Sequence, residues 1–208
     1  DASQRMVSVA FVSRYIALEG VDGSGKSTVA AALAARLEAL GEGVATVREP
    51  GGSSVGEVIR GLLLDSETLD ERAEALLFAA QRAVLTSEVI RPALDAGKWV
   101  ISDRTFYSSI AYQGRARGMG ERKIRELNEW AVAGTTPDLV VVLDVDPSEA
   151  LARQHRADRI GGEGVDFQAR VRSAYLDLAG SEPERVLVLD GALTVDEMVD
   201  RILERVGR

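Results

Sequence analysis

The stretch Gly20–Ser27 constrains the fold of this chain more than any other, because its letters GVDGSGKS fit the phosphate-binding pattern G-x-x-x-x-G-K-[ST]. The apolar run 15–19 before it predicts a buried strand, and the apolar stripe over 28–40 after it predicts a helix. Glycines let such a loop turn tightly, so that successive backbone N–H groups point at one anion, and the following helix N-terminus adds positive charge. Strand, loop and helix in this order indicate a nucleotide-binding α/β protein.

Short apolar runs alternate with helical patterns along the rest of the chain. The predicted strands are 15–19, 44–47, 99–102, 139–143 and 186–189. The predicted helices are 28–40, 54–64 with Ser54 as its N-cap, 70–93, 108–113, 121–133, 147–156, 166–179 and 194–205. This alternation predicts an α/β fold of the P-loop NTPase class, a three-layer, doubly wound, five-stranded parallel sheet with ligands at the carboxyl ends of its strands.

The phosphate-binding loop assigns chemical roles by residue type. Lys26 is expected to reach the β- and γ-phosphates of ATP, and the Ser27 hydroxyl to ligate Mg²⁺. Asp103 follows the apolar run 99–102, as the carboxylate of a Walker-B strand does, and is expected to meet the Mg²⁺ directly or through water. The residues expected to bind ATP are Gly20, Val21, Asp22, Gly23, Ser24, Gly25, Lys26, Ser27 and Thr28.

Composition narrows the function classes. The formal net charge of −8 disfavours nucleic acid as the main partner, and no run approaches the roughly 18–20 apolar residues of a membrane span. The chain has no cysteine, which suits a cytoplasmic location, and its single histidine, His155, excludes a multi-histidine metal centre. Residues 1–13 are interpreted as an N-terminal extension of uncertain origin.

Several separated stretches together resemble bacterial thymidylate kinase. They are 21–28 (VDGSGKST), 48–52 (REPGG), 77–82 (LFAAQR), 103–104 (DR) and 108–114 (SSIAYQG). Many families share the first, whereas the REPGG turn and the DR and SSIAYQG block are far more specific. The resemblance covers one domain, 14–208, with a nucleoside monophosphate kinase-like fold. It implies the reaction ATP + dTMP → ADP + dTDP with Mg²⁺ in pyrimidine deoxynucleotide synthesis, and a homodimer.

The resemblance also implies an acceptor site. Phe78 and Arg82 lie one helical turn apart and are expected to stack on the pyrimidine and to donate to a base carbonyl. The family usually has Asp before this arginine, and Gln81 in its place leaves the orientation of Arg82 open. Arg104 is expected to clamp the acceptor phosphate with its forked guanidinium. The residues expected to bind dTMP are Asp22, Glu49, Arg60, Phe78, Arg82, Arg104, Ser109, Tyr112 and Gln113.

A polar, Gly- and Arg-rich segment around 153–165 falls where the family carries its lid. Some members place a catalytic arginine inside the P-loop, at the position that is Gly23 here. The lid must then supply the missing charge, and Arg153 and Arg159 join Lys26 and Arg104 as the predicted catalytic residues.

Two other functions stay open. One is a different nucleoside monophosphate kinase, acting on UMP, CMP or GMP, and the other is a nucleotide-binding domain without turnover. A GTPase is disfavoured because the sequence has no [NT]-K-x-D motif, and a nucleic-acid-dependent ATPase is disfavoured by the acidic charge. The sequence leaves undecided whether dUMP is accepted and which lid arginine acts.

Overall fold

The computed structural model describes residues 14–153 and 160–208, and a five-stranded sheet forms its centre. All strand pairs are parallel, in the order β2-β3-β1-β4-β5. The strands are β1 (Tyr15–Glu19), β2 (Val44–Arg48), β3 (Trp99–Asp103), β4 (Leu139–Asp144) and β5 (Val186–Asp190). The predicted doubly wound parallel sheet is therefore confirmed. From β1 the chain crosses to the edge strand β2, returns inward to β3, and then passes β1 to β4 and β5, which puts the topological switch point beside the loop that follows β1.

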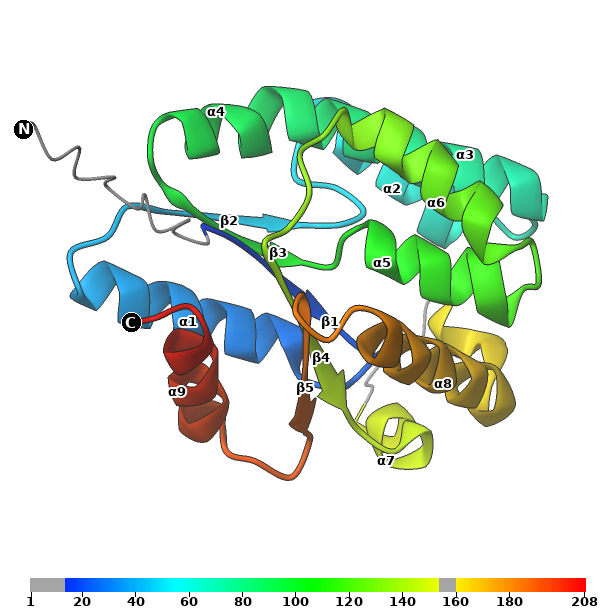
Figure 1. Cartoon of the computed structure of the whole chain (residues 1–208). Coiled ribbons are helices and arrows are strands. Elements are labelled where there is room, and N and C mark those ends of the chain that lie inside the picture. Colours follow the sequence, from blue (N-terminus) through cyan, green and yellow to red (C-terminus); the bar gives the residue numbers. More distant parts are fainter. Residues whose placement is uncertain (1–13, 154–159) are drawn as a thin grey trace, which may run out of the picture.

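Helices cover both faces of the sheet (Figure 1). In chain order the helical elements are α1 (Lys26–Ala39), α2 (Ser54–Asp65), α3 (Glu71–Leu85), the π-helical η1 (Thr86–Ile90), α4 (Arg91–Asp95), α5 (Phe106–Ser109), the π-helical η2 (Ile110–Ala116), α6 (Glu121–Val132), α7 (Pro147–Ala152), the 3₁₀ turn η3 (Gly161–Glu163), α8 (Val165–Ser181) and α9 (Val195–Arg205). Every helix among these described residues is too short or too polar to cross a bilayer.

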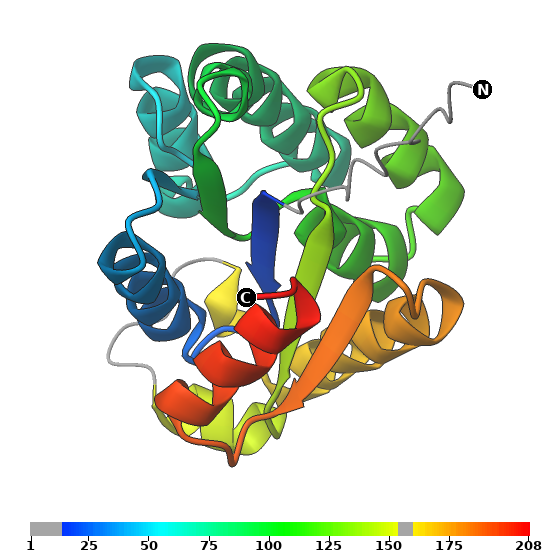
Figure 2. The ribbon, with the colours of Figure 1, turned by 60° about the vertical axis from the view of Figure 1, so that its left-hand side comes forward.

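Alternating side chains of β1 separate the core into two sides. Ile16 and Leu18 pack with the apolar faces of α1 and α9, which lie together on one side of the sheet (Figures 1 and 2). Ala17 packs with η2, α6 and α8 on the other side. Both sides of β1 are fully buried, as expected for a central parallel strand. The loop that leaves β1 therefore starts from one of the most rigidly held points in the fold.

Four strands extend one residue further than predicted and end on a polar side chain. Parallel pairing continues through these residues, so that Arg48 lies opposite Asp103 and Asp144 lies opposite Asp190. Apolar periodicity alone does not detect them. Their inclusion in the ladder matters for function because it fixes charged groups at the carboxyl edge of the sheet.

Other element boundaries also differ from the prediction. The predicted N-cap Ser54 is wrong by one residue, because Ser53 has the extended backbone of a cap and its Oγ accepts from Gly56 N at 3.0 Å. The predicted helix 70–93 is α3, η1 and α4 in succession, ending at Asp95. The predicted helix 147–156 ends at Ala152, and its last three residues lie outside the described part of the chain.

Candidate active site

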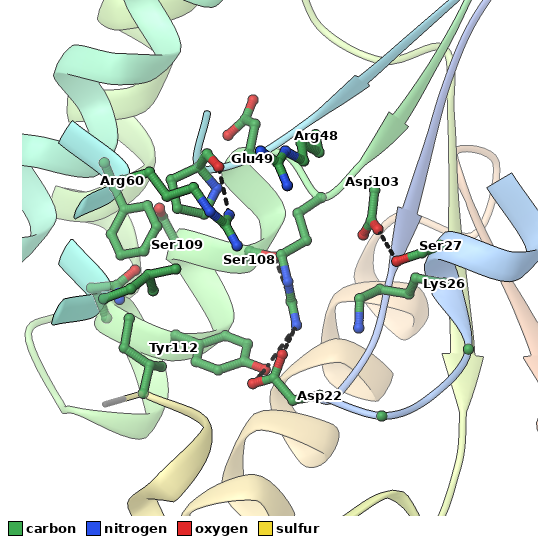
Figure 3. A pocket seen from close by; sticks show the side chains of 18 of the residues that line it. Asp22, Lys26, Ser27, Arg48, Glu49, Arg60, Asp103, Ser108, Ser109 and Tyr112 are labelled. Carbon is green, nitrogen blue, oxygen red and sulfur yellow. Dashed lines mark hydrogen bonds and ion pairs between the residues drawn. The ribbon is translucent and has the colours of Figure 1, made fainter. Parts of the chain in front are cut away.

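A cavity of about 440 Å³ opens at the carboxyl edge of the sheet, between the P-loop and helices α2, α3, α5 and η2 (Figure 3). The predicted site residues that line it are Asp22, Gly23, Gly25, Lys26, Ser27, Thr28, Glu49, Arg60, Phe78, Asp103, Arg104, Ser109, Tyr112, Gln113 and Arg153. Gly20, Val21, Ser24 and Arg82 do not line it, and Arg159 lies outside the described residues. The fold thus brings segments from across the chain to one cleft.

The P-loop surrounds the buried side chain of Lys26. Its Nζ donates to the carbonyl oxygens of Val21 at 2.7 Å and Gly20 at 3.2 Å, and to Ser24 Oγ at 3.3 Å. Gly20, Val21 and Ser24 therefore do not line the cavity, but they hold the Lys26 side chain in place from behind it. Burial, with the neighbouring charge of Arg104, lowers the pKa of Lys26 to about 8. The loop thus presents a cation that a bound polyphosphate would stabilise.

Gly23 is the point where the P-loop touches α7. It has a φ of +84°, and a Cβ placed there would lie 2.1 Å from the carbonyl oxygen of Ala150. No side chain fits at this position, so an arginine at this point of the P-loop is sterically excluded. The same contact seats α7 on the loop, and Arg153, one turn after Ala150, reaches the cavity. The positive charge that an arginine in the loop would supply comes instead from Arg153, at the end of α7.

Ser27 and Asp103, the two predicted metal-site residues, are in direct contact. Ser27 Oγ donates to Asp103 Oδ2 at 2.5 Å, and both side chains line the cavity. A hydroxyl and a carboxylate are hard oxygen donors, which fit Mg²⁺ when phosphates and water supply its remaining ligands. Within the described ranges no group of three or more His, Cys, Asp or Glu side chains gathers to hold a metal alone.

Arg104 follows β3 directly and fixes the floor of the cavity. It has a left-handed φ of 74°, a conformation that costs a non-glycine residue about 1–3 kcal/mol. Its Nη2 donates to Asp22 Oδ1 at 2.5 Å, and its Nη1 donates to Ser108 Oγ at 3.0 Å and to the Gly20 carbonyl at 3.2 Å. The guanidinium also stands 5.2 Å from the centre of the Tyr112 ring. A cation is thereby held against the P-loop, next to Ser108 and Tyr112.

The negative charge of Asp22 compensates the two neighbouring cations of the cavity, Arg104 and Lys26. Burial alone would raise its pKa, but the adjacent Arg104 and Lys26 hold the pKa of Asp22 below its ordinary value. Tyr112 contributes a further hydrogen bond, donating from its hydroxyl to Asp22 Oδ2 at 3.2 Å. The carboxylate is therefore ionised and ties the P-loop to the helix that carries Tyr112.

The cavity wall opposite the P-loop is flatter and less charged than the P-loop side. Phe78 of α3 lies there partly buried, beside Ser109 and Gln113, whose side chains are almost fully buried. Arg60 of α2 closes this end, with its Nη1 donating to the Pro50 carbonyl at 2.7 Å. An aromatic face bordered by hydroxyl and amide groups suits a planar heterocycle with polar edges.

Arg82 departs from its predicted place, because it lies behind this wall and not on it. The residue is 1% exposed, and its Nε donates to Glu49 Oε2 at 2.6 Å. Its Nη groups donate to the Thr105 carbonyl and Ser109 Oγ, each at 3.2 Å, and to Asn128 Oδ1. The predicted hydrogen bond from Arg82 to a base carbonyl is thus not supported, since its donors are engaged inside the protein.

Gln81 provides a physical reason for this placement. It carries no charge, so Glu49 at the end of β2 is the carboxylate that compensates the buried guanidinium of Arg82. Gln81 Nε2 donates to the same Glu49 Oε2 at 3.1 Å. Burial raises the pKa of Glu49, and its Oε1 has no hydrogen-bond partner among residues 14–153 and 160–208. Glu49 also lines the cavity.

Several residues of the site were not predicted from the sequence: the cavity-lining Pro50, Leu64 and Ile160, and three polar residues. Arg48 and Ser108 line the cavity, and both stand inside motifs that were recognised without giving them a role. Glu19 is fully buried at the end of β1 and accepts from Ser108 Oγ at 2.6 Å, Tyr175 OH at 2.7 Å and Thr105 N at 2.7 Å. The available signal for Glu19 was an acidic residue closing an apolar strand directly before the P-loop.

A P-loop with an adjacent arginine, Arg104, and an aromatic wall across one cavity is the arrangement of a P-loop nucleotide kinase, which holds two phosphorylated ligands. The family model described as thymidylate kinase matches residues 18–202 of the chain. The chain belongs to the thymidylate kinase family, and the predicted resemblance is confirmed.

Individual relatives agree with the family match. The thymidylate kinase of Clavibacter michiganensis subsp. michiganensis is 48% identical over 196 residues, covering 92% of this chain and 93% of that protein. The thymidylate kinase of Bifidobacterium longum is 46% identical, covering 88% and 91%. The crystal structure of thymidylate kinase from Ehrlichia chaffeensis has a TM-score of 0.79 at 31% identity, covering 94% of this chain and 99% of that one.

Proposed function

We propose that this chain transfers the γ-phosphoryl group of ATP to dTMP by direct in-line attack. A dTMP phosphate oxygen forms the new P–O bond, the bond between the γ-phosphorus and the β–γ bridging oxygen breaks, and ADP leaves with that oxygen. Family membership makes dTMP phosphorylation the activity of the chain. The residue roles, the metal and the assembly are the parts proposed here.

The donor half of the site is proposed to be the P-loop. Its backbone N–H groups and Lys26 would hold the β- and γ-phosphates, and Ser27 and Asp103 would hold Mg²⁺, which supplies charge neutralisation between those phosphates. The contact of Ser27 with Asp103 and the weakly compensated charge of Lys26 support these roles.

The acceptor half is proposed to be the opposite wall. Arg104 would bind the dTMP phosphate and Phe78 would stack on thymine, while the free Oε1 of Glu49 would accept from the sugar or from a metal-bound water. Tyr112 would pack on the deoxyribose. The position of Arg104 supports its role, because its guanidinium lines the cavity and is forked as a phosphate contact requires, although binding would replace some of its present partners such as Asp22.

No strong general base is needed, because the attacking phosphate oxygen is already largely ionised at neutral pH. The protein contributes positioning and charge neutralisation through Lys26, Arg104 and the lid arginines. Arg153 reaches the cavity, and Arg159 stays a prediction outside the described residues. The exclusion of any side chain at Gly23 supports the view that the additional charge comes from the lid.

The proposal includes a homodimer formed through α2, α3 and α6, which lie side by side (Figure 1). Val55, Val58 and Leu62 follow helical spacing on α2 and are exposed, as are Leu76 on α3 and Trp130 on α6. Apolar side chains exposed on adjacent helices are typical of a protein–protein contact. The proposal also includes a cytoplasmic location, where ATP and dTMP are both available.

The observation that carries the proposal is one cavity lined by Phe78 and by two adjacent cations, Lys26 and Arg104, which both donate to the Gly20 carbonyl. An ADP-release assay with ATP, Mg²⁺ and a panel of nucleoside monophosphates tests it. We expect dTMP to have the highest kcat/KM. Faster turnover of UMP, CMP or GMP would indicate the other monophosphate kinases, and ATP binding with no product would indicate a domain without turnover.

A further inference from the structure

Gln113 lies in the cavity wall that is proposed to bind dTMP. Its hydrogen-bond partner determines which end of its side-chain amide faces the cavity. Its Nε2 lies 2.7 Å from Glu74 Oε1 in a buried contact. A carboxylate accepts hydrogen bonds and does not donate them, so only the NH₂ end of the amide can face Glu74. The carbonyl end, Oε1, is therefore left for the cavity that Gln113 lines. Within the described part of the chain, none of the recorded hydrogen bonds uses this oxygen.

Glu74 is itself held in place. Its side chain is 1% exposed on α3, and Arg117 donates to both of its oxygens, from Nε at 3.0 Å and from Nη2 at 3.3 Å. Arg117 is fixed in turn by Glu163 at 2.7 Å and by the face of Phe167 at 5.2 Å. A buried, bidentate ion pair is rigid, so the acceptor that faces Gln113 cannot readily turn away.

The neighbouring Ser109, unlike Gln113, can offer a hydrogen-bond donor to the cavity. Arg82 Nη1 donates to Ser109 Oγ at 3.2 Å from behind the wall. This occupies a lone pair of the hydroxyl and leaves its O–H free to donate elsewhere. The wall therefore presents a hydrogen-bond acceptor at Gln113 and a donor at Ser109, one turn of helix apart.

We propose that Glu74 is a positioning residue that acts through Gln113 and selects the acceptor base by its protonated ring nitrogen. Thymine and uracil present an N3–H donor beside a carbonyl acceptor, which complements this wall. Cytosine presents a bare N3 acceptor, which opposes the carbonyl oxygen of Gln113, whereas the second lone pair of Ser109 could still accept from the cytosine amino group. A site with a fixed buried polar group discriminates strongly because a mismatched base leaves that group unpaired. This inference rests on the proposed function and specifies the base that the site accepts.

The test compares kcat/KM for dTMP and dCMP in wild-type enzyme and in Glu74→Gln. The substitution keeps the shape of the side chain but adds a donor, which lets the amide of Gln113 turn over. We expect the dTMP-to-dCMP ratio to fall about tenfold or more, through the KM of the monophosphate, with the KM of ATP unchanged. Glu71→Gln is the matched control, because Glu71 lies on the same helix and faces Arg117 at 4.0 Å without contacting Gln113. Its ratio should equal that of wild type.

A double-mutant cycle separates positioning from a structural effect. In a Gln113→Ala background, Glu74→Gln should leave the ratio unchanged, because the residue through which Glu74 acts is gone. An equal fall of the ratio in both backgrounds would overturn the proposal, as would an unchanged ratio in folded Glu74→Gln. In either case wild-type turnover of dTMP would leave the proposed function standing.

A second measurement needs no Glu74 variant and tests the orientation of Gln113, on which the proposal depends, if that variant does not fold. N3-methyl-dTMP lacks the donor, so wild-type enzyme should use it at least about tenfold less well than dTMP, and Gln113→Ala should largely lose this discrimination. Equal use of both nucleotides by wild type would contradict the proposed orientation of Gln113.

Discussion

Burial disfavours the protonated form of Lys26 despite its three hydrogen bonds, which makes donor binding sensitive to alkaline pH. With a pKa of about 8, the side chain is protonated at lower pH and loses its charge as the pH rises through this value. Since kcat/KM reports on the free enzyme, we expect kcat/KM for ATP to fall above about pH 8. Lys26→Ala should reduce kcat by orders of magnitude, keep dTMP affinity in calorimetry and show no such inflection. A flat wild-type profile up to about pH 10 would contradict this role.

The ion pair between Glu49 and Arg82 should matter for stability far more than a surface pair. Both side chains are 2% exposed, so removing one charge leaves the other buried and uncompensated. We expect Glu49→Gln to lower the free energy of unfolding by about 3 kcal/mol in urea titrations. Asp200→Asn breaks the exposed pair with Arg36 and should cost less than about 1 kcal/mol. Equal losses would show that the buried charges are compensated in some other way.

The contact between the P-loop and α7 can be tested with two glycines of the same loop. Gly23 and Gly25 have φ values of +84° and +93°, but only at Gly23 would a Cβ meet a neighbouring atom, the Ala150 carbonyl oxygen at 2.1 Å. We expect Gly25→Ala to cost about 1–2 kcal/mol through backbone strain and Gly23→Ala roughly 3 kcal/mol in thermal or urea unfolding. Similar losses for the two variants would mean that α7 moves away from the loop at little cost.

The arrangement of elements could be predicted from the sequence because the relevant signals are local. The apolar runs located all five strands, and the P-loop fixed where the first of them ends. The cap of α2 could not be assigned, because Ser53 and Ser54 are chemically equal and only the backbone conformation separates them. A helix was predicted over 108–113, but the π-helical form of η2, which carries Tyr112 and Gln113, was not.

The site was predicted as a set of residues more accurately than as a set of contacts. Most of the chosen side chains line one cavity, since strand ends converge at one sheet edge. The burial of Arg82 depends on Glu49 and Asn128, which lie 33 and 46 residues away in sequence. The amide orientation of Gln113 depends on Glu74, 39 residues away. Such pairings follow from tertiary packing and have no local pattern.

The proposed assembly makes a prediction about a single exposed valine. Val58 is 67% exposed at the centre of the apolar face of α2, and a charge there would be buried without a partner in the proposed homodimer. We expect wild type to sediment as a dimer and Val58→Glu as a monomer with a similar circular dichroism spectrum. Val188→Glu on edge strand β5 is the matched control and should remain a dimer. A dimer that survives Val58→Glu would place the interface on other elements.

The account as a whole requires two nucleotides to lie end to end in one cavity, and a crystal structure with dTMP and a non-hydrolysable ATP analogue tests this most directly. We expect thymine against Phe78, the dTMP phosphate in contact with Arg104, and the terminal phosphate of the analogue at Lys26. Thymine bound at the P-loop, or either nucleotide bound outside this cavity, would contradict the account.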